Sequence, residues 1–187
     1  MSWYRNTLEA WLKELNVEAE TVLDIGGAQL PVKDRVKLWD VKNYHILDLP
    51  DYNLEDFDDE FGEGKNWRNF SNSANLVFCL EVFEYLIDPL RAFNNIREVL
   101  KADGRAYISF PLLYPVHNEV EFDSLRYTET GIRRLAREAG LKVNQIWYRK
   151  PRSQDYFWLF KFYVADGMRM AKGVDHQTYG YIVELSK

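Results

Sequence analysis

Two carboxylate positions near a glycine turn have the residue types needed to hold a nucleotide-type ligand. Asp24 lies near the end of the largely apolar run at residues 21–25, which leads into the turn Gly26-Gly27-Ala28. Asp48 follows 24 residues after Asp24, at the end of a second apolar run. Glycines let the backbone come close to a ligand because they lack a Cβ atom, and a carboxylate after the next strand can accept both ribose hydroxyls. The alternatives are an ordinary tight turn at the glycines and a plain turn carboxylate at Asp48, for which Asp51 is a rival.

A third acid, Glu81, ends the apolar run at residues 76–80. It either faces the same ligand or caps the turn that follows. Cys79, the single cysteine of the chain, lies inside this predicted strand with no activating partner beside it. We therefore do not expect a nucleophilic cysteine, an internal disulfide or a metal cluster.

His117 is the best candidate for a general base. It lies in the long segment 111–128, after a predicted strand, and an imidazole with an ordinary pKa of about 6.5 suits proton transfer near neutral pH. The alternative is a loop histidine that bonds Asp123 or a backbone carbonyl. Arg126 can clamp a phosphate or carboxylate with two hydrogen bonds, or it can order this loop together with Asp123 and Tyr127.

The alternation of apolar runs with helical patterns places these residues at the ends of parallel strands. Residues 75–111 read as a strand, an amphipathic helix and a second strand, and ligands of such βαβ folds bind at the carboxyl ends of the strands. Asp88-Pro89 begins the helix, because Asp caps free amides and Pro fits the first helical position. The other expected helices cover residues 3–16, 31–39, 128–140 and 155–171. The expected strands cover residues 21–25, 44–49, 76–80, 105–110, 141–148 and 179–185.

Composition places the chain among single-domain proteins with a substantial core. It has 187 residues, 47% of them hydrophobic, so we expect one domain over residues 1–187 that begins with a helix in residues 1–18. The longest apolar run is too short for a transmembrane segment, and we expect a cytoplasmic protein. Seven acids and no base lie in residues 51–63, whereas residues 126–172 hold eleven Lys and Arg against four Asp and Glu. The basic half can attract an anionic acceptor, but a pI near 5.3 argues against nucleic acid.

The motif Cys79-Leu-Glu81-Val-Phe-Glu84-Tyr85-Leu-Ile-Asp88-Pro89 resembles a motif of class I S-adenosylmethionine-dependent methyltransferases, in particular the small type 11-like members. The helix-to-strand segment 95–104 and the segments 114–117 and 123–128 are similar to this family as well. The resemblance covers roughly residues 21–187. It implies an α/β fold with a Rossmann-like, mostly parallel seven-stranded sheet, helices on both faces and an antiparallel last strand.

The resemblance also implies a donor site for S-adenosyl-L-methionine, with S-adenosyl-L-homocysteine as the product. The residues that it assigns to this cofactor are Asp24, Gly26, Gly27, Ala28, Asp48, Leu49, Cys79, Leu80 and Glu81. The residues that we expect toward the acceptor are Tyr85, Tyr114, Arg126 and Tyr127, with His117 as the base. Ala28 and Leu30 depart from the family's glycines, and Tyr85 replaces its usual histidine. Asp56, Asp58 and Trp67 are candidates for the adenine contact.

Three readings of function follow. The first is a methyltransferase that acts on a small-molecule or glycan-like acceptor. The second is a catalytically silent cofactor- or partner-binding module, and the third is a nicotinamide oxidoreductase, which the missing third glycine disfavours. The aromatic run at residues 156–163 can pack on the sheet or form a homodimer contact, line an apolar acceptor pocket, or touch lipid.

Overall fold

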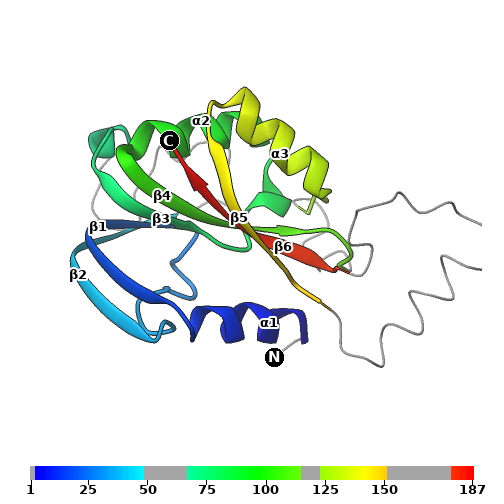
Figure 1. The fold of residues 1–187 in the computed structure, drawn as a ribbon, viewed down its shortest axis with the longest axis horizontal. Helices are drawn as coiled ribbons and strands as arrows, with labels where there is room; N and C mark the ends of the chain where they lie inside the picture. The colour runs from blue at the N-terminus through cyan, green and yellow to red at the C-terminus, as the bar shows by residue number, and fades with distance from the viewer. Residues whose placement is uncertain (1–2, 49–66, 115–122, 151–177) are drawn as a thin grey trace, which may run out of the picture.

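A six-stranded sheet forms the centre of the described part of the chain (Figure 1). The computed structural model describes residues 3–48, 67–114, 123–150 and 178–187. The strands are β1 (Asn16–Ile25), β2 (Leu38–Leu47), β3 (Ala74–Cys79), β4 (Leu100–Pro111), β5 (Lys142–Tyr148) and β6 (Gly180–Ser186), in the order β2-β1-β3-β4-β6-β5. The helices are α1 (Trp3–Leu12), α2 (Pro89–Val99) and α3 (Glu129–Glu138), and the short 3-10 turns are η1 (Trp67–Phe70) and η2 (Phe83–Tyr85).

Strand directions agree with the predicted α/β class. β1 is parallel to β2 and β3, and β3 is parallel to β4. β6 is antiparallel to both of its neighbours, β4 and β5, so the last strand alone runs against the others in the described sheet. The described residues contain six strands, against the seven expected from the resemblance, and the acidic segment between β2 and η1 lies outside them.

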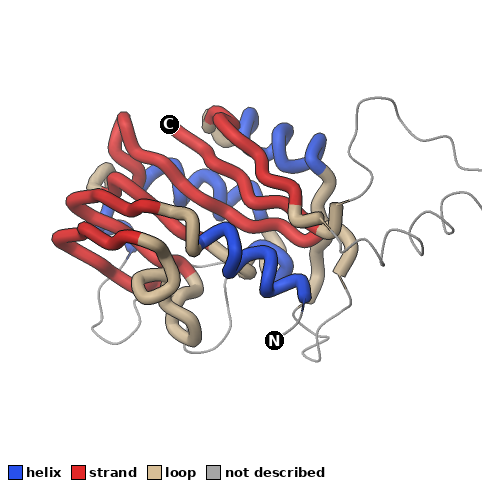
Figure 2. Tube along the Cα trace, turned by 60° about the horizontal axis from the view of Figure 1, so that its bottom comes forward, coloured by secondary structure: helices blue, strands red, loops and turns tan. Residues whose placement is uncertain are grey.

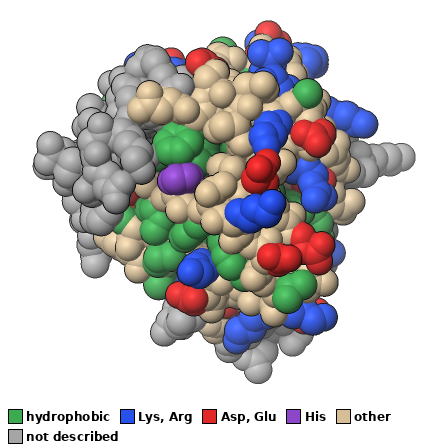
Figure 3. All heavy atoms as spheres, turned by 90° about the vertical axis from the view of Figure 1, so that its left-hand side faces the viewer, with side chains coloured by type: hydrophobic (Ala, Val, Ile, Leu, Met, Phe, Trp, Pro, Cys, Tyr) green, Lys and Arg blue, Asp and Glu red, His purple; other side chains and the backbone are tan. Residues whose placement is uncertain are grey.

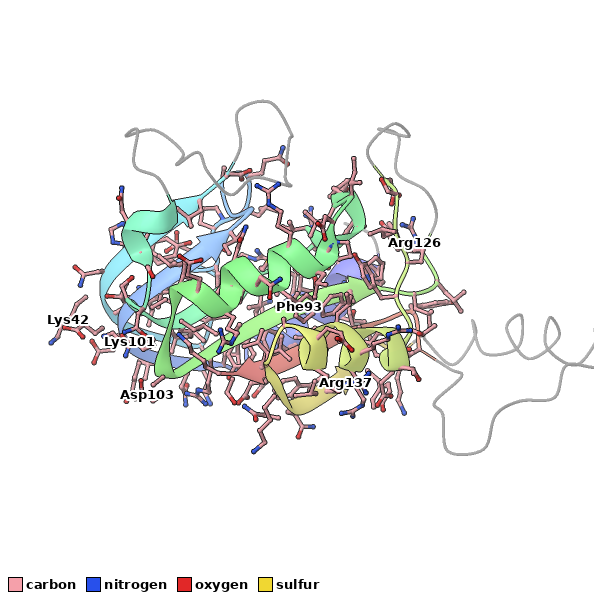
Figure 4. The ribbon with its side chains drawn as sticks, turned by 90° about the horizontal axis from the view of Figure 1, so that it is seen from above. Lys42, Phe93, Lys101, Asp103, Arg126 and Arg137 are labelled. Carbon is pink, nitrogen blue, oxygen red and sulfur yellow. The ribbon has the colours of Figure 1, made fainter. Side chains whose placement is uncertain are left out.

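Helices cover both faces of the sheet (Figure 1). Leu8 and Leu12 of α1 pack with Val22 and Phe78 on one face, and Figure 2 shows α1 in front of the strands. The apolar sides of α2 and α3 pack on the other face, where Phe93 lies over the sheet (Figure 4). Each helix therefore buries one apolar stripe, as its sequence pattern predicts.

Local capping chemistry places α2 and α3 as predicted. Asp88 accepts a hydrogen bond from the Arg91 N–H at 3.0 Å, and Pro89 occupies the first turn of α2. Thr128 caps α3 in the same way. Gly140 follows α3 with a φ of +70°, a left-handed conformation that glycine adopts readily.

The expected helix at residues 31–39 is absent, and that prediction was wrong. The residues between β1 and β2 form turns, and β2 already begins at Leu38. Val32 N–H donates to Asp24, and the N–H groups of Lys37 and Leu38 donate to the Leu15 carbonyl. A helix would need such donors for its own ladder once past its first turn. α1 is also shorter than expected and ends at Leu12, because the next strand starts at Asn16.

Two further boundaries differ from the predictions. β1 and β2 each span 10 residues, since they pair continuously from Asn16↔Leu38 to Ile25↔Leu47. The turn expected at Asp103-Gly104 lies within β4, where the pairing with β3 shifts in register. No described helix is long and apolar enough to cross a membrane. On the face drawn in Figure 3, basic and acidic side chains are mixed rather than separated.

Candidate active site

The carboxyl ends of three neighbouring strands meet at one edge of the sheet. β1 lies between β2 and β3, and Ile25 at its end is in register with both Leu47 and Cys79. The glycine turn after β1, Asp48 after β2 and Glu81 after β3 therefore start from the same level of the sheet. The predicted donor residues of the described chain gather where an open α/β sheet binds its ligands.

The glycine turn approaches its neighbours too closely for side chains. Gly26 has a φ of +77°, and a Cβ atom there would lie 2.3 Å from Val82 Cγ2. Its N–H donates to the Leu47 carbonyl at 2.8 Å, and Ala28 N–H donates to Asp48 Oδ2 at 2.9 Å. The turn is thus fastened to the end of β2 by two hydrogen bonds.

Asp24 lies beneath this turn and is 2% exposed. Its Oδ2 accepts hydrogen bonds from Val32 N–H at 2.8 Å and from the Tyr44 hydroxyl. Burial raises the pKa of Asp24 to about 6, against the hydrogen bonds from Tyr44 and Val32, which lower it. A Cβ on Gly27 would lie 2.4 Å from Asp24 Cγ. In this position Asp24 packs against Gly27 and is bonded to Val32 and Tyr44, and a direct contact with a ligand stays a prediction.

Glu81 at the end of β3 has a φ of +59°, in the left-handed region. Its N–H donates to Ser109 Oγ at 2.7 Å, and the Ser109 hydroxyl donates to Glu81 Oε1 at 2.8 Å. Arg149 Nη1 donates to the same oxygen at 2.6 Å. The hydrogen bonds of this carboxylate within the described residues go to β4 and to the end of β5, so Glu81 does not cap the turn after its own strand.

Glu84 lies in η2 and is 2% exposed. Its Oε2 has no hydrogen-bond partner in the described structure. Burial, and next the charge of Glu81, raise the pKa of Glu84 to about 8, so the carboxyl is mainly protonated at neutral pH. Its backbone carbonyl accepts from Ser124 N–H and Leu125 N–H, at 2.8 and 3.0 Å. η2 therefore connects the donor edge to the segment after β4.

On the acceptor side, the described contacts of Arg126 order its own loop. The guanidinium pairs with both oxygens of Asp123 and donates to the carbonyls of Tyr114 and Leu125. Figure 4 shows Arg126 at the end of the molecule opposite to Lys101 and Asp103. These contacts agree with the alternative in which Arg126 orders its own loop. They also engage the guanidinium N–H groups that would otherwise bind an anion.

The three tyrosines that were predicted on this side differ in burial. Tyr127 is buried, and its hydroxyl donates to the Phe83 carbonyl at 2.7 Å. Tyr85 is partly buried against the core. The Tyr114 ring lies against that of Tyr4, with 4.4 Å between centroids. His117 and Leu49 lie outside the described residues, as do the adenine candidates Asp56 and Asp58.

Cys79 is fully buried, as predicted. Burial raises the pKa of its thiol well above the ordinary value, with smaller contributions from Asp24 and Glu84. The thiolate that a nucleophile requires is therefore disfavoured. Leu80 is also buried. The side chains of Cys79 and Leu80 therefore pack in the core, and their backbone forms the edge of the sheet at the end of β3.

Sequence reasoning missed Arg149, Ser109 and Tyr4. Arg149 is 2% exposed, yet in the sequence it is one of two adjacent bases after a strand, with nothing to distinguish it from Lys150. Ser109 is a single hydroxyl within a buried strand, and that polar interruption of an apolar run was the available signal. Tyr4 is one of several aromatics in the amphipathic pattern of α1.

The edge fits a nucleoside donor with a charged arm. The turn with Gly26 and Gly27 lies beside the carboxylate of Asp48, and the backbone of Glu81 follows the neighbouring strand end. A carboxylate at this edge has the chemistry to accept hydrogen bonds from ribose hydroxyls.

Comparisons with known proteins agree with this geometry. A family model described as a methyltransferase domain matches residues 2–146. An S-adenosylmethionine-dependent methyltransferase structure from Mesorhizobium loti is similar with a TM-score of 0.59 at 13% identity, covering 100% of this chain and 98% of that chain. Geranyl diphosphate C-methyltransferase from Streptomyces coelicolor, solved with Mg²⁺, geranyl diphosphate and S-adenosyl-L-homocysteine, gives 0.58 at 12% identity, with coverages of 97% and 80%.

A third structure is phosphoethanolamine N-methyltransferase 2 from Haemonchus contortus, solved with S-adenosyl-L-methionine. It gives a TM-score of 0.53 at 12% identity, and the match covers 98% of this chain but 52% of that chain. At these identities the likeness is one of fold. The comparison with curated proteins gives no match. Because the family model spans most of the sequence, the chain belongs to the methyltransferase domain family, the class I S-adenosylmethionine-dependent methyltransferases.

Proposed function

We propose that the protein binds S-adenosyl-L-methionine at the carboxyl ends of β1, β2 and β3 and transfers its methyl group to a small-molecule or glycan-like acceptor. The observation that carries this proposal is the register of Ile25 with both Leu47 and Cys79. It brings the glycine turn, Asp48 and Glu81 to one edge of the sheet, in a chain of the methyltransferase domain family.

Each donor-side group has a role that its chemistry suits. Asp48 and the backbone at Leu49 bind the ribose, since a carboxylate accepts two hydroxyl protons. The turn Gly26-Gly27-Ala28 lets the cofactor approach the backbone, and Asp24 packs against Gly27 on its buried side. The backbone of Cys79, Leu80 and Glu81 lies along the methionine arm.

The chemistry requires alignment more than activation. When bound, S-adenosyl-L-methionine supplies a methyl group already activated by its sulfonium, and S-adenosyl-L-homocysteine is the product. The protein holds the acceptor atom in line with the methyl group in a water-poor site. His117 takes the proton of the acceptor where one must be lost. Tyr85 and Tyr114 border the acceptor, and the contacts of Arg126 and Tyr127 shape the loop around it.

The proposal also covers the charge of the acceptor, the location in the cell and a homodimer contact. The excess of Lys and Arg in residues 126–172 favours an acceptor with a negative charge, rather than a nucleic acid. We expect the protein to act in the cytoplasm and to associate, if it forms a homodimer, through residues 155–171. That segment lies outside the described residues.

Calorimetric titration of the folded protein with S-adenosyl-L-methionine, S-adenosyl-L-homocysteine and NADH tests the donor. We expect micromolar binding of the first two and no response to NADH. A folded sample that binds neither methyl-donor ligand at millimolar concentration would contradict the proposal. Binding followed by a screen of anionic and glycan-like acceptors then separates an enzyme from a silent binding module, with His117→Ala expected to lower turnover and leave donor affinity unchanged.

A further inference from the structure

Arg149 is a buried cation that joins segments far apart in the sequence. Its side chain is 1% exposed. Nη2 donates to the Tyr4 carbonyl at 2.7 Å, and Nε donates to Thr7 Oγ1 at 3.1 Å. The guanidinium carbon lies 3.4 Å from the centroid of the Tyr4 ring, a cation–π contact. Arg149 thus fastens α1 to the end of β5.

The same guanidinium holds the end of β3. Its Nη1 donates to Glu81 Oε1 at 2.6 Å, and Ser109 bonds both that oxygen and the Glu81 N–H. Glu81 needs such restraint, because its φ of +59° is unfavourable for a residue with a Cβ atom. Strained conformations of this kind persist where the surrounding structure imposes them, and they cluster at functional sites.

Stability alone does not account for this arrangement. The Arg149 side chain is 1% exposed and that of Glu81 is 21% exposed, so the guanidinium loses its hydration, and an ion pair with such a cost is often no more stabilising than well-packed apolar residues of similar volume. In this geometry Arg149 and Ser109 fix the side-chain and backbone conformation of Glu81. Residues around a binding site commonly fix the groups of that site in this way. The supported group, Glu81, ends the strand whose backbone we place along the methionine arm of the donor.

We propose that Arg149 is a positioning residue of the methyl-donor site. It acts through Glu81, whose left-handed backbone it holds together with Ser109. This inference rests on the proposed function, because it takes the end of β3 as a wall of the donor site. Arg149 itself is too buried to touch the ligand.

Isothermal titration of the full chain with S-adenosyl-L-methionine and S-adenosyl-L-homocysteine tests the role. For Arg149→Met we expect Kd to rise by roughly tenfold or more, as the loss of a restraint on a strained residue implies. Glycine adopts a left-handed φ without a restraint. The double variant Glu81→Gly/Arg149→Met is therefore expected to recover an affinity within about threefold of the wild type.

Two single variants separate positioning from loss of structure. Ser109→Ala removes the other support of Glu81 and leaves Arg149 paired, so it should also weaken donor binding, and it tests the inference if Arg149→Met does not fold. Glu9→Gln weakens a different attachment of α1, the ion pair with Arg35 at 2.6 Å. It should lower thermal stability without changing Kd.

The outcomes are distinguishable. Wild-type affinity in folded Arg149→Met, wild-type affinity in Ser109→Ala, or a double variant as weak as Arg149→Met would each overturn the positioning role while leaving the proposed function intact. If Glu9→Gln weakened donor binding as much as Arg149→Met does, the positioning role would also be overturned. Any weaker attachment of α1 would then be enough to lower the affinity. A wild-type protein that binds neither ligand would overturn the proposed function and this inference together.

Discussion

Ala28 N–H donates a hydrogen bond to Asp48 Oδ2 over 2.9 Å, which joins the turn after β1 to the end of β2. The two residues are 20 positions apart in the chain. The bond orients one carboxylate oxygen of Asp48 toward the turn, at the edge where Ile25 and Leu47 are in register. Asp48 is thereby part of the turn and of the proposed ribose site at once.

Asp48→Asn should lower the affinity for S-adenosyl-L-methionine by about tenfold or more, because an amide offers one acceptor oxygen where the carboxylate offers two and carries no charge. Asp103→Asn is the matched control, since Asp103 is exposed and precedes Arg105, which pairs with Leu76 three residues before the carboxyl end of β3 at Cys79. Calorimetric Kd values measure both variants. Equal affinities for Asp48→Asn and the wild type would show that the ribose is bound elsewhere.

Gly27→Ala should destabilise the protein, because the new Cβ would lie 2.4 Å from Asp24 Cγ. Overpacking of this kind costs about 1–3 kcal/mol of unfolding free energy, and it should weaken donor binding as the turn shifts. Gly131→Ala, in α3, brings its Cβ to 3.3 Å from Thr128 Oγ1 and should change the unfolding free energy by less than about 1 kcal/mol. Urea denaturation compares the two, and a Gly27→Ala variant as stable as Gly131→Ala would contradict the close approach.

Glu84→Gln should remove a pH dependence of stability. The pKa of Glu84 is raised to about 8 in the folded protein, first by burial, from an ordinary value of 4.5. Between these values the folded state holds the proton more tightly, so this group's contribution to stability is greatest below pH 4.5 and declines as pH rises toward 8. Glutamine cannot ionise, so the variant does not lose this contribution to stability as pH rises.

Urea denaturation of wild type and Glu84→Gln at pH 5 and pH 8 measures the effect. The variant should gain on the wild type by on the order of 1 kcal/mol or more between the two pH values. Asp24, whose pKa burial raises to about 6, contributes the same slope to both proteins and cancels in the comparison. A difference that is flat with pH would mean that Glu84 titrates normally.

Tyr127→Phe should cost about 1–2 kcal/mol of unfolding free energy, because it leaves the buried Phe83 carbonyl without the hydroxyl that lies 2.7 Å away. Tyr148→Phe is the control. Its hydroxyl donates to Glu129 in a part-buried bond, where water can replace it, so a smaller loss is expected. Thermal or urea unfolding measures both, and an equal loss would argue against a special role of the bond between η2 and the segment after β4.

Local patterns predicted much of the fold correctly. Caps at Asp88 and Thr128 and the glycine at Gly140 specify α2 and α3, because those residues satisfy helix ends within a few positions of the chain. The buried strand β3 was recognisable from its continuous apolar run. Of β2, only the end at residues 44–47 was predicted, as part of the expected strand 44–49, since the earlier residues are half-exposed or exposed and the length of β2 is set by pairing with β1.

The sequence by itself determined the family motif, the βαβ order and the acids and glycines that end the strands, since each of these depends on neighbours along the chain. Only the tertiary structure decided what those residues contact. Register aligns Ile25 with Leu47 and Cys79, and burial raises the pKa of Glu84. Arg149 meets Glu81 from 68 positions away, and no local pattern encodes such a contact, because it exists only when α1, β3 and β5 have packed around one guanidinium.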